Sequence, residues 1–356
     1  MPSRRLLLVL AAAVVGALVL GGADPAAADP ARPTDYRSRV LAVEPGLPAG
    51  VTLRVVGGDG FLLLEVAPGH TATVPDYEQG RGQAVGTYLR FRADGVVERN
   101  DASLAAQVND ARYGSDPGSA WRPGAAPRWR QVASGGRYAW HDHRIHWMLD
   151  RPPTALDERG RVDLGGPGGT WTVPLVVDGT ARVASGELIV LDPPPLWPWL
   201  VLAVLAAALV VGVALARDRR RRAVPHVALA LGLGGVGIAA TAVAAGGWRS
   251  LPAGTGVGPV GTLVALAGTV LAGSAAIALV RGRPAVARAA LAGAAAALGS
   301  WAVLRRDVLT HAVLPTEVAF GLDRAATALA LGTAVGVAAV LVWRPPAAPR
   351  PEGGGP

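Results

Sequence analysis

The chain has 356 residues, 51% of them hydrophobic, and its 34 basic residues, all arginine, exceed its 26 acidic residues to give a formal net charge of +8. The absence of cysteine excludes a disulfide framework, a cysteine-ligated zinc site and a thiol nucleophile. The positive charge is typical of nucleic-acid binders. However, the hydrophobic residues are gathered into long uncharged runs, which argues against a single soluble domain.

Residues 1–28 are predicted to form a signal peptide. Arg4 and Arg5 precede an unbroken apolar stretch from Leu6 to Leu20, and Ala26 to Ala28 supply the small side chains that signal peptidase requires. Cleavage is expected after Ala28. The alternative is an uncleaved anchor helix.

Residues 29–192 are predicted to form an all-β domain. Strands at 51–56 and 61–66 flank a glycine-rich turn, and the unit 170–191 alternates apolar and polar residues on both sides of Asp178-Gly179. A short helix is expected at 102–109, inside a long loop. Several short strands at this spacing predict an immunoglobulin-like antiparallel sandwich.

Residues 193–343 are predicted to form an all-α transmembrane bundle of five helices, followed by a disordered tail at 344–356. Each segment is long and apolar enough to cross the ~30 Å hydrocarbon core. Their alanine and glycine content favours a compact bundle. At the membrane edge, the neighbours Arg306–Asp307 and Asp323–Arg324 are expected to compensate each other's charge. The segments lie at about 196–216, 227–247, 260–280, 285–304 and 325–342.

The arginines predict the orientation. Ten lie in the first loop, the third loop and the tail, and four lie on the opposite side. By the positive-inside rule, the C-terminus is cytoplasmic and residues 29–195 lie outside, at the plasma membrane. Residues 29–195 carry 18 arginines and 20 acidic residues, whereas residues 196–356 carry 14 and five. The net charge therefore reflects topology, and no nucleic-acid partner is expected.

One segment, 138–148, concentrates groups that bind metals. It holds His141, His143, His146 and Met148, and the only other methionine is the initiator. Imidazole suits copper, zinc and nickel, and a thioether selects Cu(I). In an extracytoplasmic, cysteine-free domain, this composition points to copper.

A straight strand cannot aim all three histidines at one ion, because side chains alternate between its faces. It would offer either His141 with His143 or His146 with Met148. A turn or bulge around 142–144 would gather them. Otherwise further ligands must come from His70, from the amine of Asp29, or from His311 if the fourth loop folds up against the sandwich.

The alternative interpretation of this segment is structural. Asp142, His143 and Arg144 would then form a hydrogen-bonded network beneath core aromatic residues. Nucleophile elbows and phosphate-binding loops are missing from the sequence, and its membrane segments lack the buried acids of ion-driven transporters. We therefore expect no enzyme activity.

The layout as a whole resembles membrane-anchored secreted proteins of actinobacteria that combine a signal peptide, a β-rich domain with a Trp-His-Asp-His-Arg-x-His-Trp string, and several C-terminal helices. No activity is established for that group. The hairpin 169–188 is also similar to the last hairpin of CopC-type copper-resistance domains. The metal-binding histidine of that family is Thr180 here, and the mature N-terminus is Asp29 in place of histidine, so no ligand is carried over.

The sequence therefore suggests a protein of the cell envelope, in contact with the lipid bilayer, that binds or handles a metal ion, with copper favoured. His141, His143, His146 and Met148 are the predicted ligands, with His311 as a contributor. The alternative is a non-catalytic scaffold that docks an envelope or membrane protein through its sandwich.

Overall fold

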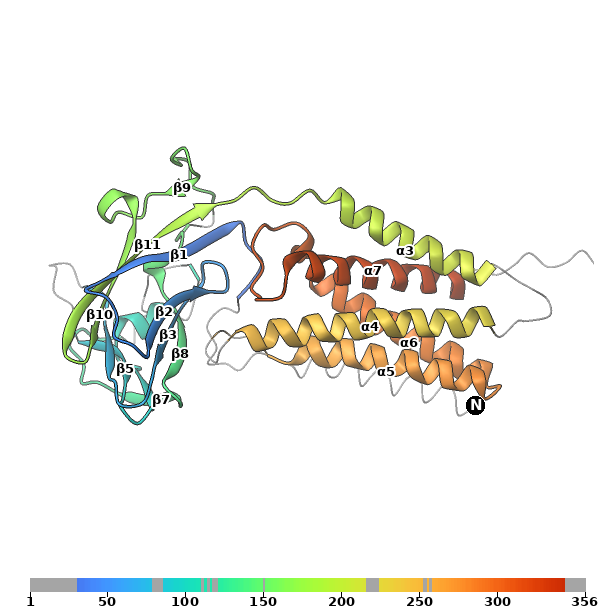
Figure 1. Cartoon of the computed structure of the whole chain (residues 1–356), viewed down its shortest axis with the longest axis horizontal. Helices are drawn as coiled ribbons and strands as arrows, with labels where there is room; N and C mark the ends of the chain where they lie inside the picture. Colours follow the sequence, from blue (N-terminus) through green and yellow to red (C-terminus); the bar gives the residue numbers. More distant parts are fainter. Residues whose placement is uncertain are drawn as a thin grey trace, which may run out of the picture.

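The structure is a computed structural model, and it describes residues 31–78, 86–109, 112–113, 116, 121–149, 151–215, 224–251, 255 and 258–342. A β-rich region occupies one end of an elongated molecule and a helical bundle the other (Figure 1). The predicted signal peptide, the arginine-rich first loop and the tail lie outside the described residues.

The β region is antiparallel throughout. Its elements are β1 (Tyr36–Glu44), β2 (Val51–Val56), β3 (Phe61–Val66), β4 (Ala72–Pro75), β5 (Thr87–Phe91), β6 (Val97–Asn100), α2 (Leu104–Val108), β7 (Trp129–Ala133), β8 (Arg137–His141), the 3₁₀ turn η1 (His143–Ile145), β9 (Arg161–Val162), the 3₁₀ turn η2 (Pro167–Gly169), β10 (Trp171–Val177) and β11 (Thr180–Val190). The larger sheet has the order β1-β11-β10-β4-β5-β6-β7, with β9 paired to β11. The smaller sheet is β2-β3-β8.

The two sheets share one hydrophobic core. Leu64 of β3 and Trp140 of β8 belong to the same cluster as Leu89 of β5 and Leu175 of β10. Both predicted hairpins are confirmed, and the alternating residues of β10 are buried as expected. The antiparallel β region is therefore confirmed, whereas its immunoglobulin-like class stays a prediction.

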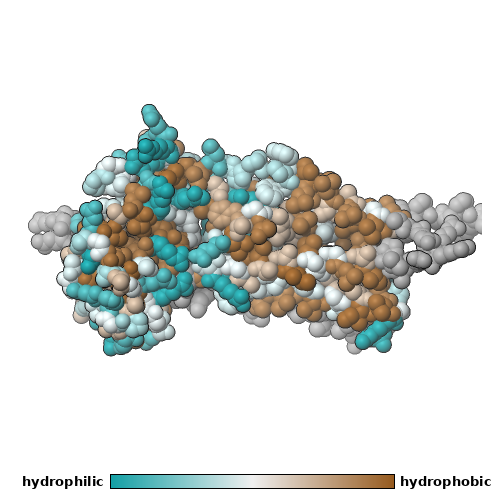
Figure 2. Space-filling model, viewed as in Figure 1, coloured by the Kyte–Doolittle hydropathy of each residue, from teal (hydrophilic) through white to brown (hydrophobic). Residues whose placement is uncertain are grey.

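Five long helices follow, each apolar enough to span a membrane. They are α3 (Trp197–Leu215), α4 (Val224–Ser250), α5 (Val260–Val280), α6 (Pro284–Leu304) and α7 (Phe320–Val342), with the 3₁₀ turn η3 (Arg306–Leu309) between the last two. α3 packs mainly on α7, while α4 packs on α5 and α5 on α6. Figure 2 shows a largely hydrophobic bundle surface beside a mixed, more hydrophilic β region. The five-span membrane prediction is thereby supported.

The β region is docked on the ends of the helices through the segment between α6 and α7. Thr34 and Val313 exchange two backbone hydrogen bonds of 3.0 and 2.8 Å, and the amide of Ala312 donates to Asp35 at 2.8 Å. Leu251, directly after α4, packs with Phe61 in a small hydrophobic cluster on the outer face of β3 and β8. The fourth loop therefore does lie against the β region, which is the condition under which the sequence allowed His311 to contribute to the site.

One predicted ion pair is wrong. Asp323, 1% exposed, pairs with Arg305, whose guanidinium lies 2.7 Å from both of its carboxylate oxygens. Arg324 instead donates to the backbone carbonyls of Val308 and His311. Sequence adjacency misled the prediction, because neighbouring helical residues point in different directions. Arg306 and Asp307 do lie close, at 3.7 Å.

Candidate metal centre

The candidate centre begins where strand β8 ends. Tyr138 and Trp140 point into the shared core, while Ala139 packs on the opposite face with Phe61. The alternation of a strand places His141 on the same outer face, and its ring contacts the Phe61 ring edge-on at a centroid distance of 5.5 Å. The chain then leaves the sheet in the 3₁₀ turn η1. Segment 138–148 is therefore not one straight strand.

A buried ion pair holds this turn. Asp142 is fully buried and caps η1 by accepting from the amide of Arg144 at 3.1 Å. The guanidinium of Arg144 donates to both carboxylate oxygens, at 2.8 and 2.7 Å, and the indole of Trp140 donates at 2.9 Å. Burial raises the pKa of Asp142, but the charge and hydrogen bonds of Arg144 outweigh it and leave that pKa below its ordinary value. The turn is thus built around an ionised carboxylate.

Tyr77, which is distant in the sequence, also contacts the turn. Its hydroxyl accepts from the amide of His143 at 2.9 Å, and its ring lies 4.8 Å from the guanidinium carbon of Arg144. Ile145, with no exposed surface, anchors the turn in the shared core. This is the hydrogen-bonded network that the structural interpretation of the segment expected around Asp142 and Arg144.

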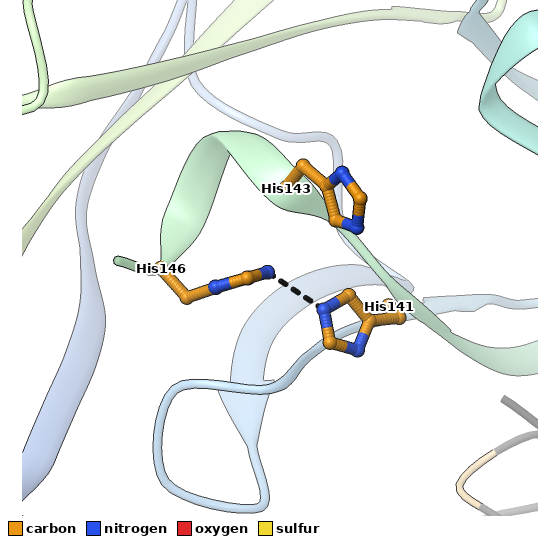
Figure 3. Close-up of side chains that lie close together, drawn as sticks. All are labelled: His141, His143 and His146. Carbon is orange, nitrogen blue, oxygen red and sulfur yellow. Dashed lines mark hydrogen bonds between the residues drawn. The ribbon is translucent and has the colours of Figure 1, made fainter. Parts of the chain in front are cut away.

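The turn brings the three histidines together (Figure 3). One ring nitrogen of each lies within 4.8 Å of the others. The Nε2 atoms of His141 and His146 are 2.7 Å apart, and the ring of His143 lies edge-on, with its centroid 5.4 Å from those of both other rings. A strand alone could not achieve this convergence, and the gathering turn considered from the sequence is present.

The two buried rings are neutral. His141 and His146 are 3% and 1% exposed. Burial, followed by the other histidines, lowers the pKa of His141 to about 2. For His146, burial lowers the pKa to about 3, although its hydrogen bond to Trp147 opposes this. Neutral imidazole is the form that binds metals.

The hydrogen bonds also define the tautomers. Nδ1 of His146 lies 2.9 Å from the carbonyl of Trp147 and must donate to it, so Nε2 of that ring presents a lone pair toward His141. Nδ1 of His141 is buried and has no hydrogen-bond partner among the residues that the structure describes. A buried polar atom left without a partner is destabilising, and such exceptions in a native fold suggest a functional constraint.

The spacing is close to what an ion requires. Metal–imidazole bonds of about 2.0–2.1 Å at tetrahedral angles place ligand nitrogens ~3.3 Å apart. The 2.7 Å between His141 and His146 must therefore widen by roughly 0.6 Å, while the third ring must approach. With these adjustments the cluster would supply three nitrogen ligands and leave a fourth position open.

A second buried ion pair borders the centre. Arg112 donates to Asp59 at 2.6 Å, and its positive charge contributes to the lowered pKa values of both buried histidines. Asp59 has no exposed surface, and within the described part of the chain its Oδ1 has no hydrogen-bond partner. The sequence had suggested only a turn residue here, because the pairing joins positions 53 residues apart.

His311 and His70 do not belong to the group formed by the three rings. Met148 is partly buried two residues beyond His146, and its role as a ligand stays a prediction. His311 contacts the carbonyl of Asp307 at 3.0 Å through Nδ1, and His70 pairs with Asp178 at 2.7 Å. Asp29 lies outside the described residues.

The chain matches no protein-family model, no curated protein and no solved structure. The resemblances to actinobacterial membrane-anchored proteins and to CopC-type domains therefore stay predictions. Only the geometry of the centre therefore indicates a function.

Proposed function

We propose that the protein binds a metal ion at the envelope through His141, His143 and His146, and that copper is its metal. The convergence of three ring nitrogens within 4.8 Å carries the proposal. The Nε2 atoms of His141 and His146 face each other, and no described residue offers them a backbone or carboxylate partner. A purely structural role would favour such partners.

Copper is favoured on chemical grounds. A site of nitrogen ligands binds Cu(II) more tightly than Zn(II), according to the Irving–Williams order. A thioether two residues away, in Met148, would add affinity for Cu(I) if the segment after His146 turned back toward the rings. We propose a binding protein and not an enzyme.

The membrane orientation belongs to the same proposal. The β region would be an immunoglobulin-like sandwich outside the plasma membrane, with its N-terminus created by signal cleavage and the C-terminus of the chain in the cytoplasm. In support, α3 begins at the end of the molecule that carries the β region, and the turn between α5 and α6, with Arg281 and Arg283, lies at the opposite end (Figure 1). The actinobacterial and CopC-type resemblances remain compatible with this proposal.

A scaffold function is the second candidate, and the Asp142–Arg144 network favours it. The network alone would explain why the chain forms a buried turn at this position. In that case the β region would dock a partner protein and the histidines would only fill space. The two candidates differ in one measurable property, the uptake of a metal.

The test uses the purified full chain in detergent, because the β region packs on the bundle. We expect one equivalent of Cu(II), or of Cu(I) under reducing conditions, to bind in competition with a chelator. His141→Ala and His146→Ala should each weaken binding by more than the ~10–100-fold typical of changes to residues that only hydrogen-bond to a metal ligand. His70→Ala, which removes a histidine outside the cluster, is the matched control.

Two further variants refine the ligand set. Met148→Leu should weaken Cu(I) alone if the thioether binds, and His311→Ala tests the predicted contribution of the fourth loop. Stoichiometric zinc uptake without copper would correct the metal and keep the site. Absence of binding at micromolar concentrations of either metal would refute the metal proposal and leave the scaffold.

A further inference from the structure

A cavity of about 250 Å³ lies where the β region meets the bundle. Its walls come from β1, from β2 and the turn after it, from the end of α4, and from the segment before α7. They include Arg37, Arg39, Arg54, Ser250, Leu251 and Thr316. The backbone hydrogen bonds between Thr34 and Val313 close the junction beside it. The cavity is therefore formed only when both regions are docked.

The walls carry more basic than acidic groups: three arginines, of which Arg39 pairs with Glu187, against Glu317. Arg37 is exposed and has no ion-pair partner among the described residues. Arg54 pairs with Glu317 at 3.0 Å, with both side chains substantially exposed, and such exposed pairs contribute only about 0–1 kcal/mol. An incoming anion can therefore displace Glu317 at little cost, and two guanidinium groups become available to it.

The chemistry of these groups defines the ligand. Guanidinium presents its N–H donors in a planar fork that matches phosphate oxygens. A volume of about 250 Å³ lies just below the ~300–1,000 Å³ of pockets for drug-sized ligands. It suits a headgroup or a small phosphate ester, and not a folded segment or a peptide.

The position of the cavity indicates where the phosphate comes from. Ser250 is the last residue of α4, and Thr316 lies four residues before α7, so the cavity is level with the ends of two membrane spans. Trp248, 40% exposed in the last turn of α4, is of the type that favours the water–lipid boundary. Lipid headgroups occupy this level, and basic pockets beside membrane helices bind them.

We propose that this cavity binds a phosphate-bearing anion through Arg37 and Arg54, and that its source is the headgroup of an anionic phospholipid at the membrane surface. The acyl chains then lie along the apolar surface of the bundle. The bound headgroup links the β region to the membrane, because both arginines belong to the β region and the opposite wall belongs to the helices. The proposal is independent of the metal centre.

The test compares lipids on the full chain. The protein is purified in detergent with phosphatidylglycerol or with phosphatidylcholine, and retained lipid is measured by native mass spectrometry together with the thermal midpoint. We expect one phosphatidylglycerol to be retained and to raise the midpoint, with tenfold or greater loss of affinity in Arg37→Gln/Arg54→Gln. Arg281→Gln/Arg283→Gln removes the same charge at the opposite end of the bundle and should retain the lipid.

Inorganic phosphate and glycerol 3-phosphate, added to protein in phosphatidylcholine, separate the two sources. These two compounds could raise the thermal midpoint of the unaltered protein but not that of Arg37→Gln/Arg54→Gln. If they do so and phosphatidylglycerol is not retained, the ligand is a soluble phosphate ester and the lipid source is overturned. If the double variant misfolds, Arg37→Gln alone tests the site, because Arg37 has no ion pair among the described residues that the substitution could break. This single variant should measurably weaken retention of phosphatidylglycerol. Retention unchanged in these variants, or lost equally in the control, overturns the site.

Discussion

The β region and the helical bundle are built from opposite kinds of interior. The core shared by the sheets is filled by large side chains, including Trp140, Trp171, Phe91 and Leu175. The bundle buries mainly alanine and turns its large side chains outward, among them Leu205, Leu209, Leu231 and Leu263. Fully buried alanines of the bundle include Ala230, Ala240, Ala265, Ala272, Ala275, Ala294, Ala297 and Ala330.

The difference follows from the solvent of each region. In water, removing large apolar side chains from contact with solvent drives folding. In lipid, leucine gains little from burial, so helices associate where small residues let their backbones approach. The same side chain therefore stabilises one region and is nearly neutral in the other, which makes the comparison testable.

The largest effect is expected inside the β region, at the charge that holds the histidine turn. The Asp142 carboxylate has no exposed surface, and Arg144→Met removes the positive charge that compensates it. This variant should destabilise the β region by about 3–5 kcal/mol. Denaturant unfolding followed by tryptophan fluorescence measures it. The matched control Arg92→Met breaks the exposed pair with Asp94 and should change stability by about 0–1 kcal/mol. Equal effects from the two variants would contradict the role given to the buried pair.

Leucine truncation compares the two interiors directly. Leu175→Ala removes a side chain that is 1% exposed in the core and should cost about 2–5 kcal/mol. Leu209→Ala, at a position 68% exposed on α3, should leave the unfolding midpoint almost unchanged in lipid. A comparable loss at Leu209 would mean that α3 packs on another protein surface and not on lipid.

Acid should destabilise the β region of the metal-free protein. His141 and His146 have pKa values of about 2 and 3 when folded, from an ordinary value of 6.5. The unfolded chain thus binds more protons below pH 6.5. Stability is full above that pH and is lost as the pH falls toward the folded values, by up to ~1.4 kcal/mol per pH unit for each ring.

Thermal midpoints between pH 7 and pH 5, measured with a chelator present, test this dependence. The dependence of the thermal midpoint on pH should become weaker when both His141 and His146 are replaced by phenylalanine. A midpoint that is independent of pH over this range in the unaltered protein would show that the two rings are not held neutral.

The smallest effect is expected from adding a methyl group within the bundle. A Cβ at Gly332 would collide with the carbonyl oxygen of Ala203. Gly332→Ala must therefore push α3 away from α7, at a cost of about 1–3 kcal/mol. Gly212→Ala on α3, where the added atom meets nothing within 4 Å, is the control. The thermal midpoint of the full chain in lipid compares the two; a bundle that tolerates both equally would not depend on close helix contact.

Some of this architecture could be predicted from the sequence because its signals are local. The β2–β3 and β10–β11 hairpins and the five spans follow from turn residues, alternation and hydropathy, and the segment 260–280 coincides with α5. β1 was missed because its burial pattern is mixed, so it lacks a clear period of two. β4 and β9 were missed because they are too short to show one.

For the candidate centre, the sequence by itself determined which ligands are available: three histidines within six residues, no cysteine, and one methionine beyond the initiator. Only the tertiary structure decided that the rings converge. The turn that aims them depends on Tyr77, 66 residues before His143, and on burial of Asp142. The same holds for the partner of Asp323 and for the arginine-lined cavity, because both join residues that only the docking of distant elements brings into contact.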